Sequence, residues 1–165
     1  MAHAPVTVRV LPGQSVVIVG KKTNEITQFV GDWTLEEFVI EKESDSSVVM
    51  QPFGPSPVGI LLYTAGGHMS GHIMKSEQDG RSMAEPTSPE EFSAAFTSVV
   101  AYSGTFEVDE VQRNVIHHVK ASTYPNWAGT DLVRRFEFAA DGRLILSTNE
   151  KCPPGMVNKL KWRRS

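Results

Sequence analysis

The stretch LLYTAGGHMSGHIMK, residues 61–75, decides the fold class of this chain. It places His68 and His72 four residues apart, a spacing that would align both on one face of a helix to bind zinc. Its glycines disfavour a helix, and the apolar runs on either side of AGG are typical of a strand, a turn and a second strand. Met69 also stands where the zinc-binding HExxH motif needs glutamate. The stretch therefore predicts a β-hairpin and argues against a helical zinc site.

Apolar segments with the same strand-like alternation recur along the chain, separated by turns rich in Gly, Pro, Asp and Ser. We expect strands at 6–11, 15–20, 33–41, 47–51, 58–64, 68–75, 103–109, 113–122, 131–139, 143–149 and 157–164. Nearly every strand can pair with its sequence neighbour through a short turn, which favours an antiparallel meander. Closing the meander removes its exposed edges. The expected fold is therefore all-β, an antiparallel β-barrel with one short α-helix.

The one expected helix covers residues 88–101. Ser88 at the N-cap, Pro89 at the first helical position and Glu91 at the third form a capping box. An apolar stripe follows at helical spacing, formed by Phe92, Ala95, Phe96, Val99 and Val100. We expect this stripe to pack against the mouth or the side of the barrel.

Composition limits the classes of function. The chain has 165 residues, 40% of them hydrophobic, which suits one domain with a full core. The net charge of -3 comes from interspersed charges of both signs, so nucleic acid is not an expected partner. The single Cys152 cannot form an internal disulfide, and no apolar run is long enough to span a membrane. The start lacks a signal-peptide pattern, so we expect a cytoplasmic protein without a membrane partner.

Alternation within the expected strands predicts which side chains point into the barrel, although a bulge would invert the faces beyond it. The expected inward-facing side chains are Trp33, Leu35, Glu37, Ser70, His72, Met74, Tyr102, Gly104, Phe106, Val115, His117, Val119, Arg134, Phe136 and Phe138. Among the histidines, His118 is expected on the outer face and His68 at the rim. His72 faces either a ligand or, equally, a hydrogen-bond partner in the core as a neutral imidazole.

Motifs for cofactor or nucleophilic chemistry are missing from the sequence. It contains no G-x-S-x-G, G-x-G-x-x-G or Walker pattern. Cys152 lies in a Pro-rich turn and is interpreted as an incidental surface thiol. His72 and His117 have no nearby carboxylate that would complete a zinc site. We therefore expect neither a metal nor a cofactor.

Several motifs resemble those of the bacterial and fungal lipocalin-like domain proteins, which are small calycin-type barrels. The motifs are VGDWTLEEF, PFGPSPVGILLYTAGGHMSGHIM, YSGTFEVD, VIHHVKASTYPNWAGTDLVRRFEF, GRLILST and LKWRR, in the family's order. Within the first motif, GDW resembles the lipocalin G-x-W signature. The resemblance implies that Trp33 closes the barrel floor and that Arg164 or Arg163 packs across its ring.

The resemblance also implies a division of the chain. Residues 28–165 would form the lipocalin-like barrel, and residues 1–27 would be an N-terminal extension. The segment VTVRVLPGQSVVIVG within that extension is expected to form an added hairpin that covers a barrel edge or joins a homodimer.

The first functional hypothesis is a cofactor-free isomerase or cyclase acting on a hydrophobic metabolite, such as a polyketide or terpenoid. In this hypothesis His117 is the general base, His72 or Tyr63 the proton donor and Arg134 the anion stabiliser, with Glu37 holding Arg134. The substrate would contact Tyr63, Tyr102, Trp127, Phe106, Phe136, Phe138, Met74 and Leu35. Trp127, in the YPNWAGT turn, would be a lid over the mouth or a buried corner residue.

The second hypothesis is a carrier of a hydrophobic small molecule, in which the same polar groups orient a ligand carboxylate or carbonyl. A partner-binding module is disfavoured, because no large exposed apolar surface is apparent in the sequence. Fold alone does not decide between an enzyme and a carrier.

Overall fold

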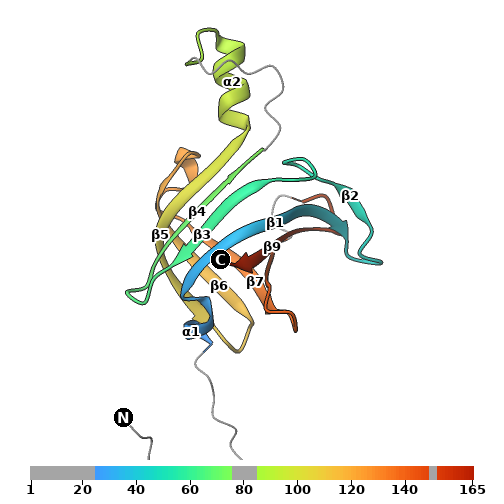
Figure 1. The fold of residues 1–165 in the computed structure, drawn as a ribbon, viewed down its shortest axis with the longest axis vertical. Coiled ribbons are helices and arrows are strands. Elements are labelled where there is room, and N and C mark those ends of the chain that lie inside the picture. Colours follow the sequence, from blue (N-terminus) through green and yellow to red (C-terminus); the bar gives the residue numbers. More distant parts are fainter. Residues whose placement is uncertain (1–24, 76–84, 149–151) are drawn as a thin grey trace, which may run out of the picture.

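A computed structural model describes residues 25–75, 85–148 and 152–165 of the chain. Within these residues nine antiparallel strands form one sheet, in the order β2-β1-β3-β4-β5-β6-β7-β8-β9. The last strand pairs back on the first, so β1 and β3–β9 close into a barrel (Figure 1). The elements are α1 (Ile26–Phe29), β1 (Gly31–Lys42), β2 (Val48–Met50), β3 (Val58–Tyr63), β4 (His68–Met74), α2 (Pro89–Thr97), β5 (Val99–Asp109), β6 (Asn114–Ser122), η1 (Pro125–Trp127), β7 (Asp131–Phe138), β8 (Leu144–Thr148) and β9 (Met156–Arg164).

The predicted all-β antiparallel barrel is confirmed. The stretch 61–75 forms the predicted hairpin, in which β3 and β4 pair from Val58 with Met74 to Tyr63 with Met69. Each strand expected between residues 33 and 164 is present, and the largest difference is that β5 begins four residues early, at Val99. The strands expected at 6–11 and 15–20, and with them the N-terminal hairpin, lie outside the described residues.

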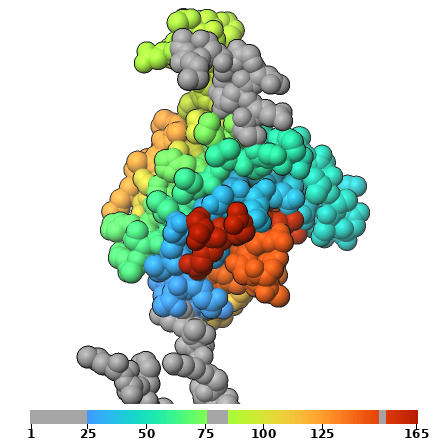
Figure 2. Space-filling view, in the orientation of Figure 1, coloured from blue at the N-terminus to red at the C-terminus, as the bar shows by residue number. Residues whose placement is uncertain are grey.

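The helix α2 has the predicted capping box but not the predicted packing. The Ser88 side chain accepts a hydrogen bond from the Glu91 backbone, and the Glu91 carboxylate accepts one from the Ser88 backbone. The helix ends at Thr97, because Val99 already belongs to β5. Since β5 continues directly from the helix, α2 stands beyond the barrel rim, as Figures 1 and 2 show.

The expectation that the apolar stripe packs on the barrel is therefore wrong. No residue of α2 is buried, and Phe92 is 59% exposed. The Phe96 ring makes an edge contact with Tyr124, with 5.3 Å between the ring centroids. Neither α2 nor any other helix in the described part of the chain has the length and apolar character needed to cross a membrane.

Aromatic side chains fill the end of the barrel that lies opposite α2. Phe29, on the short helix α1, packs edge-on against Tyr63 at 5.2 Å and against Phe136 at 4.9 Å. Phe106 lies 4.6 Å from Tyr63, again edge to face. Burying each large apolar side chain contributes about 1.5–3 kcal/mol, so this cluster forms a solid floor rather than a channel.

The floor is closed by Trp33 and an arginine from the last strand. The Trp33 indole donates a hydrogen bond to the Phe29 carbonyl at 2.8 Å, and the Arg164 guanidinium lies 4.3 Å from the indole centroid. Arg164 also donates hydrogen bonds to the carbonyls of Val30 and Gln28. Of the two arginines that the resemblance allowed, Arg164 therefore takes this position.

Candidate functional site

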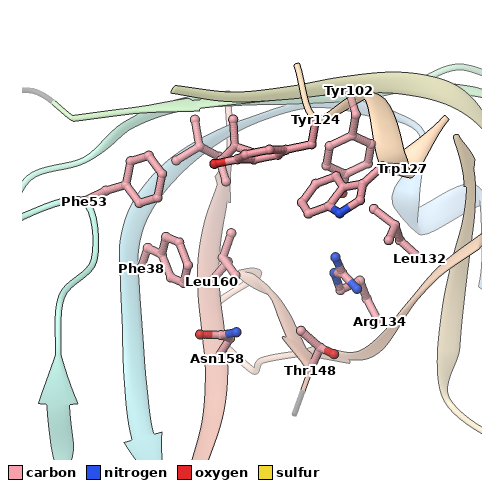
Figure 3. A pocket seen from close by; sticks show the side chains of 12 residues that line it. Phe38, Phe53, Tyr102, Tyr124, Trp127, Leu132, Arg134, Thr148, Asn158 and Leu160 are labelled. Atoms are coloured by element: carbon pink, nitrogen blue, oxygen red, sulfur yellow. The ribbon is translucent and has the colours of Figure 1, made fainter. Parts of the chain in front are cut away.

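A cavity of about 420 Å³ lies inside the barrel at the end that carries α2. Its volume falls within the range of about 300–1,000 Å³ that is usual for small-molecule sites. The described residues that line it are Phe38, Phe53, Ile73, Val100, Tyr102, Tyr124, Trp127, Leu132, Arg134, Thr148, Asn158 and Leu160 (Figure 3).

Aromatic rings form two sides of the cavity. Phe38 and Phe53 stack with 5.4 Å between their centroids. Across the cavity Trp127 meets Tyr124 at 5.0 Å and the edge of Tyr102 at 5.8 Å (Figure 3). The 3-10 helix η1 holds Trp127 half-buried at the rim. Rings placed in this way favour a flat aromatic ligand, which can stack or make edge contacts.

Arg134 brings a positive charge into this apolar space. It lies on β7 between the inward-facing Leu132 and Phe136, and its guanidinium points into the cavity toward Trp127 (Figure 3). Its Nη1 donates a hydrogen bond to the Val133 carbonyl at 2.9 Å. Among the described residues that line the cavity, Arg134 is the only charged one. The predicted inward orientation of Arg134 is confirmed.

The predicted pairing of Arg134 with Glu37 is wrong, because β1 contains a bulge. Leu35 and Glu37 pair with consecutive residues of β9, so Glu36 is an extra residue in β1. Beyond the bulge the faces are inverted. Phe38 points into the cavity, whereas Glu37 turns outward and forms an ion pair with Lys161 at 2.5 Å.

His117 lies inside the barrel as predicted, held between two tyrosines. It is fully buried, its Nε2 is 2.7 Å from the Tyr63 hydroxyl, and its Nδ1 is 2.9 Å from the Tyr102 hydroxyl. Burial, with the nearby charge of Arg134, lowers the pKa of His117 from 6.5 to about 3. The imidazole is therefore neutral and donates to one hydroxyl while it accepts from the other.

The two tyrosines of this triad differ in position. Burial raises the pKa of both hydroxyls, so both stay protonated at neutral pH. Tyr63 belongs to the aromatic floor, whereas Tyr102 lines the cavity. His117 is not among the described residues that line the cavity, and it lies behind Tyr102. A ligand would thus meet Tyr102 and not the imidazole.

The inward orientation predicted for His72 and Met74 is wrong. On β4 the buried positions are Met69, Gly71 and Ile73, so the alternate residues face outward. His72 is exposed and contacts the Ser70 hydroxyl at 3.1 Å, and Met74 is 40% exposed. The expected strand ran to residue 75, where a lysine would mark the outer face and place His72 inside, but β4 ends at Met74 and the alternation does not extend to Lys75.

Other residues expected to contact a substrate point inward but lie in the packed core. These are Leu35, Tyr63, Phe106, Phe136 and Phe138. Phe136, for example, is 2% exposed and is covered by the Arg113 guanidinium at 4.3 Å. Of the predicted contact residues, the structure places Tyr102 and Trp127 on the cavity wall.

Most residues of the cavity wall were not predicted from the sequence. The missed residues are Phe38, Phe53, Ile73, Val100, Tyr124, Leu132, Thr148, Asn158 and Leu160. One signal was available, because Leu132 shares the alternation that placed Arg134 inside. Phe53 and Tyr124 lie in loops, where alternation carries no information. In the described part of the chain, no three His, Cys, Asp or Glu side chains lie close enough to hold a metal ion.

Comparison with known proteins agrees with this architecture. The lipocalin-like domain family matches residues 30–164. The chain belongs to the lipocalin-like domain family. The matched range of this lipocalin-like domain runs from just before β1 to Arg164, so it contains the barrel, the cavity wall and the residues that close the floor.

One relative of this lipocalin-like domain is the 4'-hydroxy-3'-methoxypropiophenone carrier protein ppsC of Aspergillus oryzae. The two sequences are 34% identical over an alignment of 107 residues, and the match covers 58% of this chain and 96% of the relative.

Proposed function

We propose that this lipocalin-like domain protein binds a small aromatic molecule in the cavity and carries it without chemical change. The observation that carries the proposal is a cavity of about 420 Å³ with aromatic walls above a packed floor. The name of the Aspergillus relative, a carrier of an aromatic ketone, supports the same class of ligand. The volume suits a compact ring compound better than a long flexible chain.

The placement of the acid–base residues favours a carrier over an isomerase or cyclase. Of the proposed catalytic set, only Arg134 lines the cavity. His72 and Glu37 face outward. Both nitrogens of His117 are engaged by tyrosine hydroxyls, and its low pKa makes it a weak proton acceptor at neutral pH. A bound molecule therefore has no free general base beside it among these residues.

Titration with 4'-hydroxy-3'-methoxypropiophenone in a calorimeter tests binding. We expect saturable binding at one site per chain. The variant Leu132→Phe fills part of the cavity and should weaken binding by roughly 5- to 150-fold, because that range corresponds to a steric penalty of about 1–3 kcal/mol. Val133→Phe is the matched control, because Val133 is the next residue of β7 and its side chain is 36% exposed.

Chromatography of the ligand recovered after incubation separates a carrier from an enzyme. Unchanged ligand is expected. Conversion that depends on the protein would contradict the carrier proposal, as would equal affinity of Leu132→Phe and the wild type.

A further inference from the structure

The hydrogen-bonded triad of Tyr63, His117 and Tyr102 allows two arrangements of its protons. A neutral imidazole carries one ring proton, so His117 donates through one nitrogen and accepts through the other. If Nε2 carries the proton, Nε2 donates to the Tyr63 oxygen and Nδ1 accepts from Tyr102. If Nδ1 carries the proton, Tyr63 donates to Nε2 and Nδ1 donates to the Tyr102 oxygen. The arrangements differ in which tyrosine keeps a hydroxyl proton that the imidazole does not accept.

The surroundings of Tyr63 decide between the two arrangements. Tyr63 is 2% exposed, and its ring packs against the rings of Phe29 and Phe106. Within the described part of the chain, His117 is the one hydrogen-bond partner of the Tyr63 hydroxyl. With the ring proton on Nε2, the Tyr63 O–H would have no acceptor in the apolar floor, which disfavours that arrangement by roughly 5- to 150-fold. Tyr63 therefore donates to Nε2, and His117 carries its proton on Nδ1.

This arrangement leaves Tyr102 with a hydroxyl proton to donate. Its oxygen accepts from Nδ1 of His117, and among the described residues its hydroxyl has no second hydrogen-bond partner. Tyr102 is half-buried and lines the cavity, and its hydrogen bond with His117 is only partly buried, unlike that of Tyr63. The bond from Nδ1 holds the Tyr102 oxygen in place and polarises its O–H, which makes the hydroxyl a preorganised donor.

We propose that Tyr102 determines the specificity of the cavity by donating a hydrogen bond to the carbonyl oxygen of an aromatic ketone or aldehyde. This inference rests on the proposed function and adds to it the chemical class of the ligand. A carbonyl oxygen accepts with two lone pairs and carries no proton of its own. The ring of the ligand packs against the aromatic wall, where Trp127 lies beside Tyr102 (Figure 3). Tyr63 and His117 are positioning residues, since they fix the direction in which Tyr102 donates.

Nitrogen NMR of the wild-type protein with isotope-labelled histidine tests the tautomer without any ligand. Protonated and unprotonated ring nitrogens have well-separated chemical shifts, and couplings to the ring C–H protons distinguish Nδ1 from Nε2. The signals of His117 are those that disappear in His117→Gln. We expect a protonated Nδ1 and an unprotonated Nε2 at neutral pH. A protonated Nε2 overturns the proposal.

Binding of acetophenone and α-methylstyrene tests the ligand class. A methylene group in α-methylstyrene replaces the carbonyl oxygen, so the two probes have nearly the same shape and only acetophenone accepts a hydrogen bond. We expect Tyr102→Phe to lower the preference for acetophenone over α-methylstyrene by roughly 2- to 12-fold, the usual contribution of one hydrogen bond. Both proteins take the probes from the same water, so the hydration of the probes cancels in this comparison.

Ser103→Ala is the matched control. It removes a hydroxyl from the next residue of β5, which pairs with the outward-facing Ser70. This variant should keep the wild-type preference for acetophenone. Binding of α-methylstyrene by Tyr102→Phe shows that the variant is folded, because this probe needs no hydrogen bond. The tautomer measurement uses the wild type and so does not depend on the folding of Tyr102→Phe.

The two probes also separate this inference from the proposed function. If neither probe binds to the wild type, the proposed function fails and the inference fails with it. If both bind and Tyr102→Phe keeps the wild-type preference, the protein is a binder of aromatic molecules and the role of Tyr102 is overturned. A preference for acetophenone that falls in Tyr102→Phe and persists in Ser103→Ala supports both.

Discussion

At the scale of single residues, the hydrogen-bonded triad of Tyr63, His117 and Tyr102 has a structural role in the core of the barrel. Each imidazole nitrogen has a hydroxyl partner at 2.7 or 2.9 Å, so a fully buried polar ring carries no unsatisfied group. Such satisfied networks fix one arrangement of a core, since any alternative would bury an unpaired donor or acceptor. The triad joins β3, β5 and β6 across the barrel interior, and it holds Tyr102 at the cavity wall.

The low pKa of His117 makes the free energy of unfolding depend on pH. In the unfolded chain the imidazole regains its ordinary pKa of 6.5, whereas in the folded chain the pKa is about 3. Below pH 6.5 the unfolded state binds more protons, so this contribution is complete above pH 6.5 and decreases as pH falls. The slope approaches about 1.4 kcal/mol per pH unit between the two pKa values.

Urea unfolding of the wild type and of His117→Gln at several pH values measures this contribution. We expect the wild type to lose about 1–2 kcal/mol more than the variant between pH 6.5 and pH 5. Parallel pH dependence in the two proteins would show that His117 does not remain neutral in the folded state.

At the scale of elements, irregularities in the strands decide what reaches the cavity. The bulge in β1 brings Phe38 inward and sends Glu37 out. A second irregularity lies between Ser103 and Gly104, where β5 approaches β6 so closely that a Cβ at position 104 would be 1.9 Å from the His118 carbonyl oxygen. Only glycine permits this contact, and Tyr102, which lines the cavity, lies two residues before Gly104 on the same strand.

Gly104→Ala should therefore destabilise the barrel. The clash is with backbone, which has little freedom to move, so we expect a loss of about 1–3 kcal/mol or more in the free energy of unfolding. Gly66→Ala is the matched control, because a Cβ at position 66 would meet its nearest atom at 3.8 Å. Urea denaturation of both variants measures the difference, and equal stabilities would argue against the close approach at Gly104.

The strands and helices differ in how well the sequence predicts them. Strands between 31 and 164 follow from alternation and turn residues, and the capping box of α2 follows from local chemistry. The face on which a side chain lies depends on the regularity of its strand. Glu37 was misassigned because it lies beyond a bulge, and His72 was misassigned because the expected strand ran to Lys75 whereas β4 ends at Met74. Phe53 reaches the cavity from a loop, and only the closed barrel brings it there.

At the scale of the whole molecule, the barrel has a packed end and an open end. The aromatic floor around Phe29 and Trp33 supplies stability, whereas the cavity near α2 leaves apolar surface uncovered for a ligand. The pairing of β1 with β9 closes the cylinder, and Arg164, near the end of the chain, reaches across the floor to α1 and the start of β1. Arg164 therefore takes part both in the β1–β9 pairing that closes the barrel and in the contact with Trp33 that closes the floor.

Arg164→Ala tests whether the contacts of Arg164 with Trp33, Val30 and Gln28 stabilise the whole barrel. The substitution removes the contact over Trp33 and leaves the carbonyls of Val30 and Gln28 without the guanidinium donor, so we expect a loss of about 1–2 kcal/mol. Arg163→Ala is the matched control, since Arg163 forms an exposed ion pair with Glu36 and such pairs contribute less than about 1 kcal/mol. Thermal unfolding of both variants measures the contrast. Because the floor and the cavity lie at opposite ends of the barrel, Arg164→Ala should retain ligand affinity while its unfolding temperature falls. A larger fall in the unfolding temperature of Arg163→Ala than of Arg164→Ala would contradict the stabilising role of Arg164.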